Sequence, residues 1–193
     1  MAARIEDERL IGVRLSCRPE YSDLTGVGYI RDDCSRPDRI IIDALTKRGL
    51  PIEICHPKDC PDYLELFSPP ETMAVINRIV NSPEYCALWQ AWQHSHRKRP
   101  NLDDCLEWSE EVKRQVEAFY EENCAATSHR LARGYSRFEL LISSEKRAER
   151  TSLEESAAKH WDKAEELLGD LPSLNTESLH ALCEDIVEKV LTS

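Results

Sequence analysis

The sequence predicts an α+β fold that is mostly helical, in which a small N-terminal β-β-α-β-β sheet unit packs against a C-terminal bundle of about five or six helices. Three observations support this prediction. In the first third of the chain, apolar residues alternate with polar ones at the two-residue period of a half-buried strand. From Ser68 onward, apolar residues recur at three- and four-residue steps. Three S/T-x-x-E sequences in that part match the capping box, in which two side chains satisfy unpaired backbone groups at a helix start.

The first third contains four predicted strands and one predicted helix. Alternation is clearest in the first of the strands, which are 10–17, 27–31, 51–55 and 63–67. The helix starts near Pro37, because proline suits the first helical position. Gly49 is expected to end it, since glycine tolerates the left-handed conformation that follows many helices. The sheet then has an apolar face that other elements must cover.

Helices are predicted to supply that cover in the rest of the chain. They are expected at residues 69–80, 83–95, 102–133, 137–150, 152–168 and 177–191. Capping boxes that begin at Ser68, Ser136 and Thr151 mark three of the starts. Gly134 and Gly169 are the expected stop signals.

Length and composition indicate one compact domain, built from a lobe at 1–67 and a bundle at 68–193. A chain of 193 residues can bury about 70% of its unfolded surface without metal or disulfide support. The chain has no run of about 18 apolar residues, and charges interrupt its N-terminus, so we expect a cytoplasmic protein without a membrane span. The formal net charge of -11 opposes binding to nucleic acid or anionic membrane. The expected partner is therefore another protein, in an oligomeric state that the sequence leaves open.

The eight cysteines are expected to be free thiols, because they are scattered along a chain without a secretory signal. Cys86, Cys105 and Cys183 lie on apolar helical stripes, where a thiol serves as a small hydrophobic group. The loop Cys55–Cys60 has a thiol spacing found in zinc fingers. A second, similarly spaced pair is missing, so we expect no metal in this loop.

The densest acidic cluster lies at the start of the predicted helix 102–133. Asp103, Asp104 and Glu107 form D-D-x-x-E, which would place Asp103 and Glu107 one helical turn apart. Carboxylates in this arrangement can hold Mg²⁺ and share it with substrate phosphates. The five residues resemble the aspartate-rich motif of terpene synthases, although the second metal motif of that family is missing and the chain is shorter. An acidic first turn that complements the helix dipole is the other interpretation.

Arginines and tryptophans are the candidate substrate-binding residues of such an enzyme. Arg130, Arg133 and Arg137 could bind phosphate oxygens if they converge in space, or they could pair with glutamates on exposed helix faces. Trp89 and Trp92 belong to an aromatic stripe that either packs in the core or lines an apolar pocket.

Two classes of function remain after these observations. The first is an interaction or regulatory module that acts through helical surfaces and needs no cofactor. The second is a metal-assisted enzyme, using Mg²⁺ on a phosphate- or diphosphate-bearing substrate. We expect the module, because charged helices are abundant and the sequence shows no pairing of a nucleophile with a base. If Glu107 and two or more of Arg130, Arg133 and Arg137 face one cavity, the enzyme is favoured, and dispersed charges on convex faces favour the module.

Overall fold

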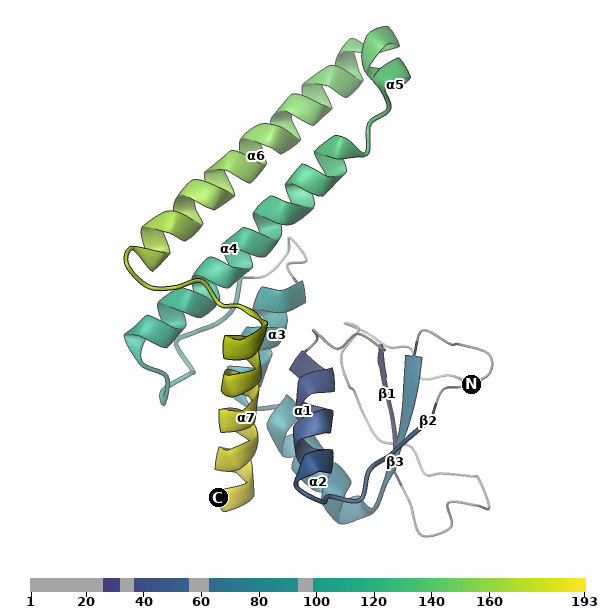
Figure 1. Cartoon of the computed structure of the whole chain (residues 1–193), viewed down its shortest axis with the longest axis vertical. Coiled ribbons are helices and arrows are strands. Elements are labelled where there is room, and N and C mark those ends of the chain that lie inside the picture. Colours follow the sequence, from purple (N-terminus) through teal and green to yellow (C-terminus); the bar gives the residue numbers. More distant parts are fainter. Residues whose placement is uncertain (1–25, 32–36, 56–62, 94–98) are drawn as a thin grey trace. The chain divides into compact units, whose positions relative to one another are not determined.

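The computed structural model describes residues 26–31, 37–55, 63–93 and 99–193. Within these ranges the chain is predominantly helical and has one small antiparallel sheet, as the sequence predicts (Figure 1). The strands are β1 (Gly26–Arg31), β2 (Glu53–Cys55) and β3 (Tyr63–Ser68). The helices are α1 (Pro37–Lys47), α2 (Pro70–Val80), α3 (Pro83–Gln93), α4 (Glu110–Arg133), α5 (Arg137–Ile142), α6 (Ser144–Leu168) and α7 (Thr176–Thr192).

Contacts group the described residues into two units. The first unit comprises the described residues up to Trp89 together with Asn175–Ser193, and the second comprises those of Gln90–Leu174. The sheet, α1, α2 and α7 therefore belong to the first unit, and α4, α5 and α6 belong to the second. The predicted lobe 1–67 and bundle 68–193 stay a prediction, because contacts do not show which segments fold on their own.

The sheet of the first unit has the strand order β1-β3-β2, and both pairs are antiparallel. β1 pairs with β3 from Gly26, opposite Ser68, to Arg31, opposite Tyr63. Three of the four predicted strands are thus present. The first predicted strand, Leu10–Cys17, lies outside the described residues, so the complete β-β-α-β-β unit stays a prediction.

The helices of the first unit bury branched aliphatic side chains, and α1 and α2 both pack against α7. The buried residues of this core include Ile40, Ile41, Ile42, Leu45, Ile76, Ile79 and Val187. Polar contacts join the same helices: Arg48 lies 3.6 Å from Glu184 and 3.7 Å from Glu188, and the Arg78 guanidinium donates to the Val190 carbonyl at 3.1 Å. The apolar stripe of the last helix thus finds its partner within the unit.

Four of the cysteines form no disulfide, as predicted, namely Cys86, Cys105, Cys124 and Cys183, and the last three of these are buried. Burial, with a smaller effect of the nearby Asp38, raises the pKa of Cys183 to about 12. Only the thiolate reacts with iodoacetamide, so we expect Cys183 to stay unmodified at pH 9 in the folded protein and to react in urea. The partly buried Cys86 serves as the internal comparison in mass spectrometry.

The raised pKa of Cys183 also determines how this residue changes the free energy of unfolding with pH. The neutral thiol of Cys183 stabilises the fold fully below the unfolded pKa of 9.0, and this contribution is lost as the pH rises towards 12. Modification of Cys183 at the same rate as Cys86 in the folded protein would contradict the described packing of α7.

In the second unit, α4 and α6 form an antiparallel hairpin, with the short α5 at its turn (Figure 1). Buried alanines recur every seven residues along both helices, at Ala118, Ala125 and Ala132 on α4 and at Ala157 and Ala164 on α6. This is the spacing of two helices packed along a coiled-coil seam. Ala118, Ala164 and Leu168 form one cluster. Such small side chains let the two helix axes approach closely.

The start of α4 differs from the prediction, because the helix begins at Glu110 and not at residue 102. Ser109 has an extended backbone, and its hydroxyl accepts a hydrogen bond from the Val112 amide at 3.3 Å. The preceding residues form turns, in which the Asn101 amide group donates to Asp104 at 2.6 Å. Asparagine and aspartate side chains that bond locally compete with helix formation, which explains the error.

A second correction concerns the predicted helices 137–150 and 152–168. The break between helices lies at Ser143, whose extended backbone and hydroxyl cap the start of α6 by accepting the Lys146 amide at 3.2 Å. Thr151, the predicted cap, lies inside α6 and donates its hydroxyl to the carbonyl four residues earlier at 3.0 Å. The prediction of a helix start at Thr151 was therefore wrong.

The other local signals gave mixed results. The capping box between Ser136 and Glu139 is confirmed. The box predicted at the start of α2 is wrong, because Pro69 occupies the N-cap and makes no side-chain cap. Gly49 and Gly169 both follow helices with positive φ angles, of 82° and 54°, so these two stop signals are confirmed.

Candidate functional site

A cavity of about 390 Å³ lies in the second unit, between α4, α6 and the segment that precedes α4. Its lining residues are Arg99, Tyr120, Glu121, Ser156, Lys159, His160 and Lys163. The four residues from α6 follow the three- and four-residue steps of one helix face. The volume falls within the roughly 300–1,000 Å³ of known small-molecule pockets.

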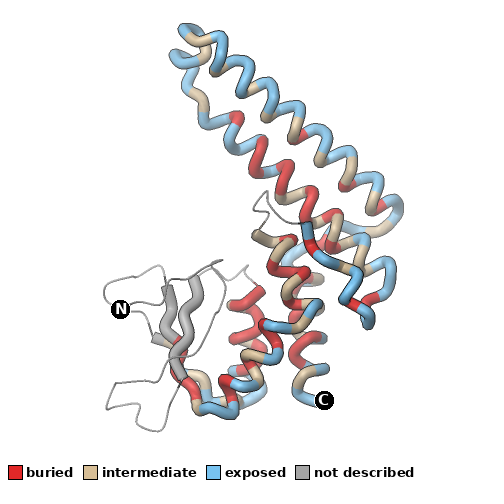
Figure 2. Tube along the Cα trace, turned by 180° about the vertical axis from the view of Figure 1, so that it is seen from behind, coloured by how far each residue is buried: buried red, intermediate tan, exposed pale blue. Residues whose placement is uncertain are grey.

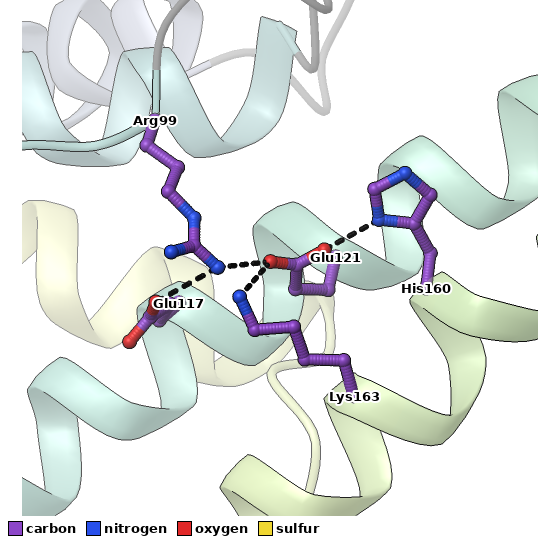
Figure 3. Close-up of polar contacts among 5 residues, drawn as sticks. All are labelled: Arg99, Glu117, Glu121, His160 and Lys163. Atoms are coloured by element: carbon purple, nitrogen blue, oxygen red, sulfur yellow. Dashed lines mark hydrogen bonds and ion pairs between the residues drawn. The ribbon is translucent and has the colours of Figure 1, made fainter. Parts of the chain in front are cut away.

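Glu121 is the centre of this cavity and is almost completely buried, with 3% of its side chain exposed. Its Oε1 accepts from Arg99 Nη2 at 2.6 Å and from Lys163 Nζ at 2.9 Å (Figure 3). Its Oε2 lies 2.5 Å from Nδ1 of His160, and because a carboxylate only accepts, this ring nitrogen carries the proton. Arg99 also lies 3.3 Å from Glu117. A buried charge is costly unless it is paired, so these contacts explain how the carboxylate stays in the hairpin.

The cavity lining carries an excess of positive charge. Among the described residues of the lining, Arg99, Lys159 and Lys163 are cations and Glu121 is the acid, so these residues carry a net charge of +2 with His160 counted as neutral. Lys159 makes no ion pair or hydrogen bond within the described ranges, while the chain as a whole has a charge of -11. Lys159 and Lys163 are four residues apart on one helix, where like charges repel.

Tyr120 lines the same cavity, and Cys124 lies one turn further along α4, outside the lining. Burial raises the pKa of Tyr120 to about 12, and a hydrogen bond with Cys124 adds to the shift. Burial also raises the pKa of the Cys124 thiol. Both groups are therefore neutral near pH 7, so Cys124 lacks the thiolate character of a nucleophile.

The predicted magnesium ligands lie elsewhere. Asp103, Asp104 and Glu107 are exposed residues of the turns that precede α4, so the helical spacing on which the prediction rested is absent. In the described part of the chain, no three histidine, cysteine or acidic side chains are grouped closely enough to hold a metal ion. Most of the Cys55–Cys60 loop lies outside the described residues, so the expectation of no metal there stays a prediction.

The predicted arginine cluster lies at the opposite end of α4 from these acids. Arg130 and Arg133 are exposed in the last turn of α4, and Arg137 is exposed at the start of α5. The 24 residues of α4 span about 36 Å, and Glu107 precedes the first of them. Glu107 and the arginines therefore face no common cavity, which is the arrangement that favours an interaction module.

The two predicted tryptophans are in α3, one turn apart. Trp89 is buried and Trp92 is partly buried, and neither lines the cavity around Glu121. The residues that do line it were not predicted from the sequence. The detectable signal was a glutamate between alanines at seven-residue spacing, because that position faces the partner helix.

Exposed apolar side chains form a second candidate site, at the turn of the hairpin. Phe138, Leu141 and Ile142 are 69%, 76% and 68% exposed, and their three- and four-residue spacing places them on one face of α5. No residue of α5 is buried, whereas buried residues run along α4 (Figure 2). We call these three residues, with Arg130, Arg133 and Arg137, the α5 surface.

Comparisons with protein-family models, with curated proteins and with solved structures found no match. Among the described helices, none combines the length and the apolar character that crossing a bilayer requires. Two places in the second unit are therefore the candidates for a function, the cavity around Glu121 and the α5 surface.

Proposed function

We propose that this chain is an interaction or regulatory module of the cytoplasm that binds another protein through the α5 surface. The observation that carries the proposal is the exposure of Phe138, Leu141 and Ile142 together on one helix face. A single exposed apolar residue is ordinary, but a cluster of large ones marks an interaction site. Their spacing matches the apolar anchors that a helix inserts into the groove of a partner.

Charge indicates the chemistry of the partner. Arg130 and Arg133 are exposed in the last turn of α4 and Arg137 is exposed at the start of α5, and none of them pairs with a carboxylate in the described ranges. These three cations close together in the sequence stand out in a chain with a net charge of -11. The complementary surface is an apolar groove bordered by aspartate and glutamate side chains.

Contacts other than the apolar side chains hold α5 in place. Ser136 and Glu139 cap its start, and Arg147 donates to the Leu140 carbonyl at 3.1 Å. The Tyr135 hydroxyl, just before α5, donates to Glu149 of α6 at 2.9 Å. Substitution of the exposed Phe138 and Leu141 should therefore change stability by no more than about 0.5 kcal/mol, which separates a loss of binding from a loss of folding.

The test is site-specific photo-crosslinking in cells, followed by affinity measurement with the purified partner. A benzoylphenylalanine at position 138 should crosslink one acidic protein, and the same group at Ala158 should not. Ala158 is exposed on α6, about 21 Å along the helix from its start. Phe138→Ser/Leu141→Ser should weaken the affinity at least about 30-fold, as anchor residues do, while Ala158→Ser leaves it unchanged.

Substitution of the arginines provides the second part of the test. Arg130→Gln/Arg133→Gln/Arg137→Gln should slow association and reduce its dependence on salt, because these charges steer the encounter. Wild-type affinity in the Phe138→Ser/Leu141→Ser variant would refute the proposal. Binding to anionic phospholipid vesicles that requires Phe138 would refute it too, and would assign the α5 surface to a membrane.

A further inference from the structure

We infer that the cavity around Glu121 binds a small phosphate monoester, whose phosphate group is held by Arg99, Lys159 and Lys163. The inference goes beyond the proposed function, because the cavity and the α5 surface are separate. Glu121 precedes Arg133, the last residue of α4, by about 18 Å along the helix. Either site can fail its test while the other passes.

Unused hydrogen-bond donors point to an acceptor-rich ligand. Both oxygens of Glu121 are already engaged by Arg99, Lys163 and His160. An ammonium group has three N–H donors and a guanidinium has five, so Arg99 and Lys163 keep donors that the carboxylate does not use. Lys159 keeps all three of its donors. A phosphate group accepts several hydrogen bonds and donates almost none, which is what this lining requires.

The charge of the lining matches the same ligand. Three cations and one carboxylate leave the described lining with a net charge of +2, of which Glu117 offsets a part at Arg99, and a phosphate monoester carries about -1.5 to -2 at pH 7. Lys159 and Lys163 repel each other across one helical turn. A bound dianion would convert this repulsion into attraction. Pairs of like charges such as this lower the stability of the folded protein, and they are expected at ligand-binding sites.

The buried Glu121 acts as a positioning residue in this site. It fixes Arg99 and Lys163 at 2.6 and 2.9 Å, although both of these long side chains reach solvent. Cations held in one geometry lose less side-chain entropy when the ligand binds, so the site is preorganised. The contacts come from three segments of the chain, as Figure 3 shows for Arg99, α4 and α6.

The volume distinguishes an ester from a free phosphate ion. A cavity of about 390 Å³ exceeds the needs of a single phosphate group. Tyr120 and His160 line the same cavity and offer ring surface, and Ser156 offers a hydroxyl. A small organic group with polar substituents is the part that would contact these side chains.

The test is isothermal titration of the full chain with glycerol 3-phosphate, inorganic phosphate and glycerol at constant ionic strength. We expect one site for the ester, weaker binding of inorganic phosphate and no binding of glycerol. Lys159→Gln should weaken binding of the ester roughly tenfold, because it removes one charge-assisted contact. Lys159 has no partner in the described structure, so this variant should fold normally.

Lys47→Gln is the matched control, since Lys47 is exposed on α1 and its substitution changes the net charge equally. Backbone amide resonances of residues 156–163 should shift on titration with the ester, and those of 137–142 should not. The inference is overturned if glycerol 3-phosphate does not bind, or if Lys159→Gln binds it as the wild type does. Tighter binding of inorganic phosphate than of the ester, or shifts confined to α5, would overturn it as well.

Discussion

Replacing both long cations that contact Glu121, in Arg99→Met/Lys163→Met, should lower the free energy of unfolding by about 3–5 kcal/mol. The two substitutions keep much of each side chain's length and remove the charges that lie 2.6 and 2.9 Å from the carboxylate. Glu121 would remain 3% exposed or nearly so, with only His160 in contact. An acid left in the hairpin without its cations loses the interactions that offset its desolvation.

The substitution Glu121→Gln should change the free energy of unfolding in opposite directions in the wild type and in Arg99→Met/Lys163→Met. In the wild type it is expected to destabilise by about 1–2 kcal/mol, because charge-assisted hydrogen bonds become neutral ones. In Arg99→Met/Lys163→Met it should stabilise, since it removes the unpaired buried charge. A change of sign of this kind measures the coupling between the carboxylate and its cations directly.

Urea denaturation of the four proteins provides the free energies, provided that the slope with denaturant is the same in each. Lys146→Met/Arg150→Met is the matched control, because it removes two cations from α6 whose partners, Glu149 and Glu154, are exposed. Each of these surface pairs should contribute about 0–1 kcal/mol. Equal effects of the control and of Arg99→Met/Lys163→Met would contradict the burial of Glu121.

Periodicity predicted the elements well, because the spacing of apolar residues reflects which face is buried. Three strands and most helices agree with the predicted periodicity. The apolar stripe of α7 packs against α1 and α2, as expected for an apolar helix face. Helix starts were less predictable, since several side chains compete to cap one helix. Ser109 and Ser143 cap α4 and α6, while Asn101 uses its side chain in a turn. Local sequence does not decide between such competitors.

The cavity was not predictable from motifs, because its residues are far apart in the chain. Arg99 precedes Glu121 by 22 residues, and His160 follows it by 39. The antiparallel packing of α4 on α6 brings Glu121 and His160 together along the alanine seam, and the segment before α4 adds Arg99. The acidic cluster at Asp103 was predicted as a site instead, because residues that are close in the sequence can be recognised as a motif without knowledge of the tertiary structure. The site therefore depends on which segments of the chain pack together in the folded protein, and the composition of the chain does not reveal this.

The seam between α4 and α6 leads to the last prediction, which concerns Ala164. This residue is 1% exposed and lies in one cluster with Ala118 and Leu168. Ala164→Leu should destabilise the protein by about 1–3 kcal/mol, because the added atoms must push the two helices apart or adopt strained rotamers. Ala158→Leu, at an exposed position of the same helix, should change stability by no more than about 0.5 kcal/mol, since leucine and alanine have similar helix propensities. Thermal and urea melts of both variants make the comparison, and a neutral or stabilising Ala164→Leu would show that the helices are not closely packed there.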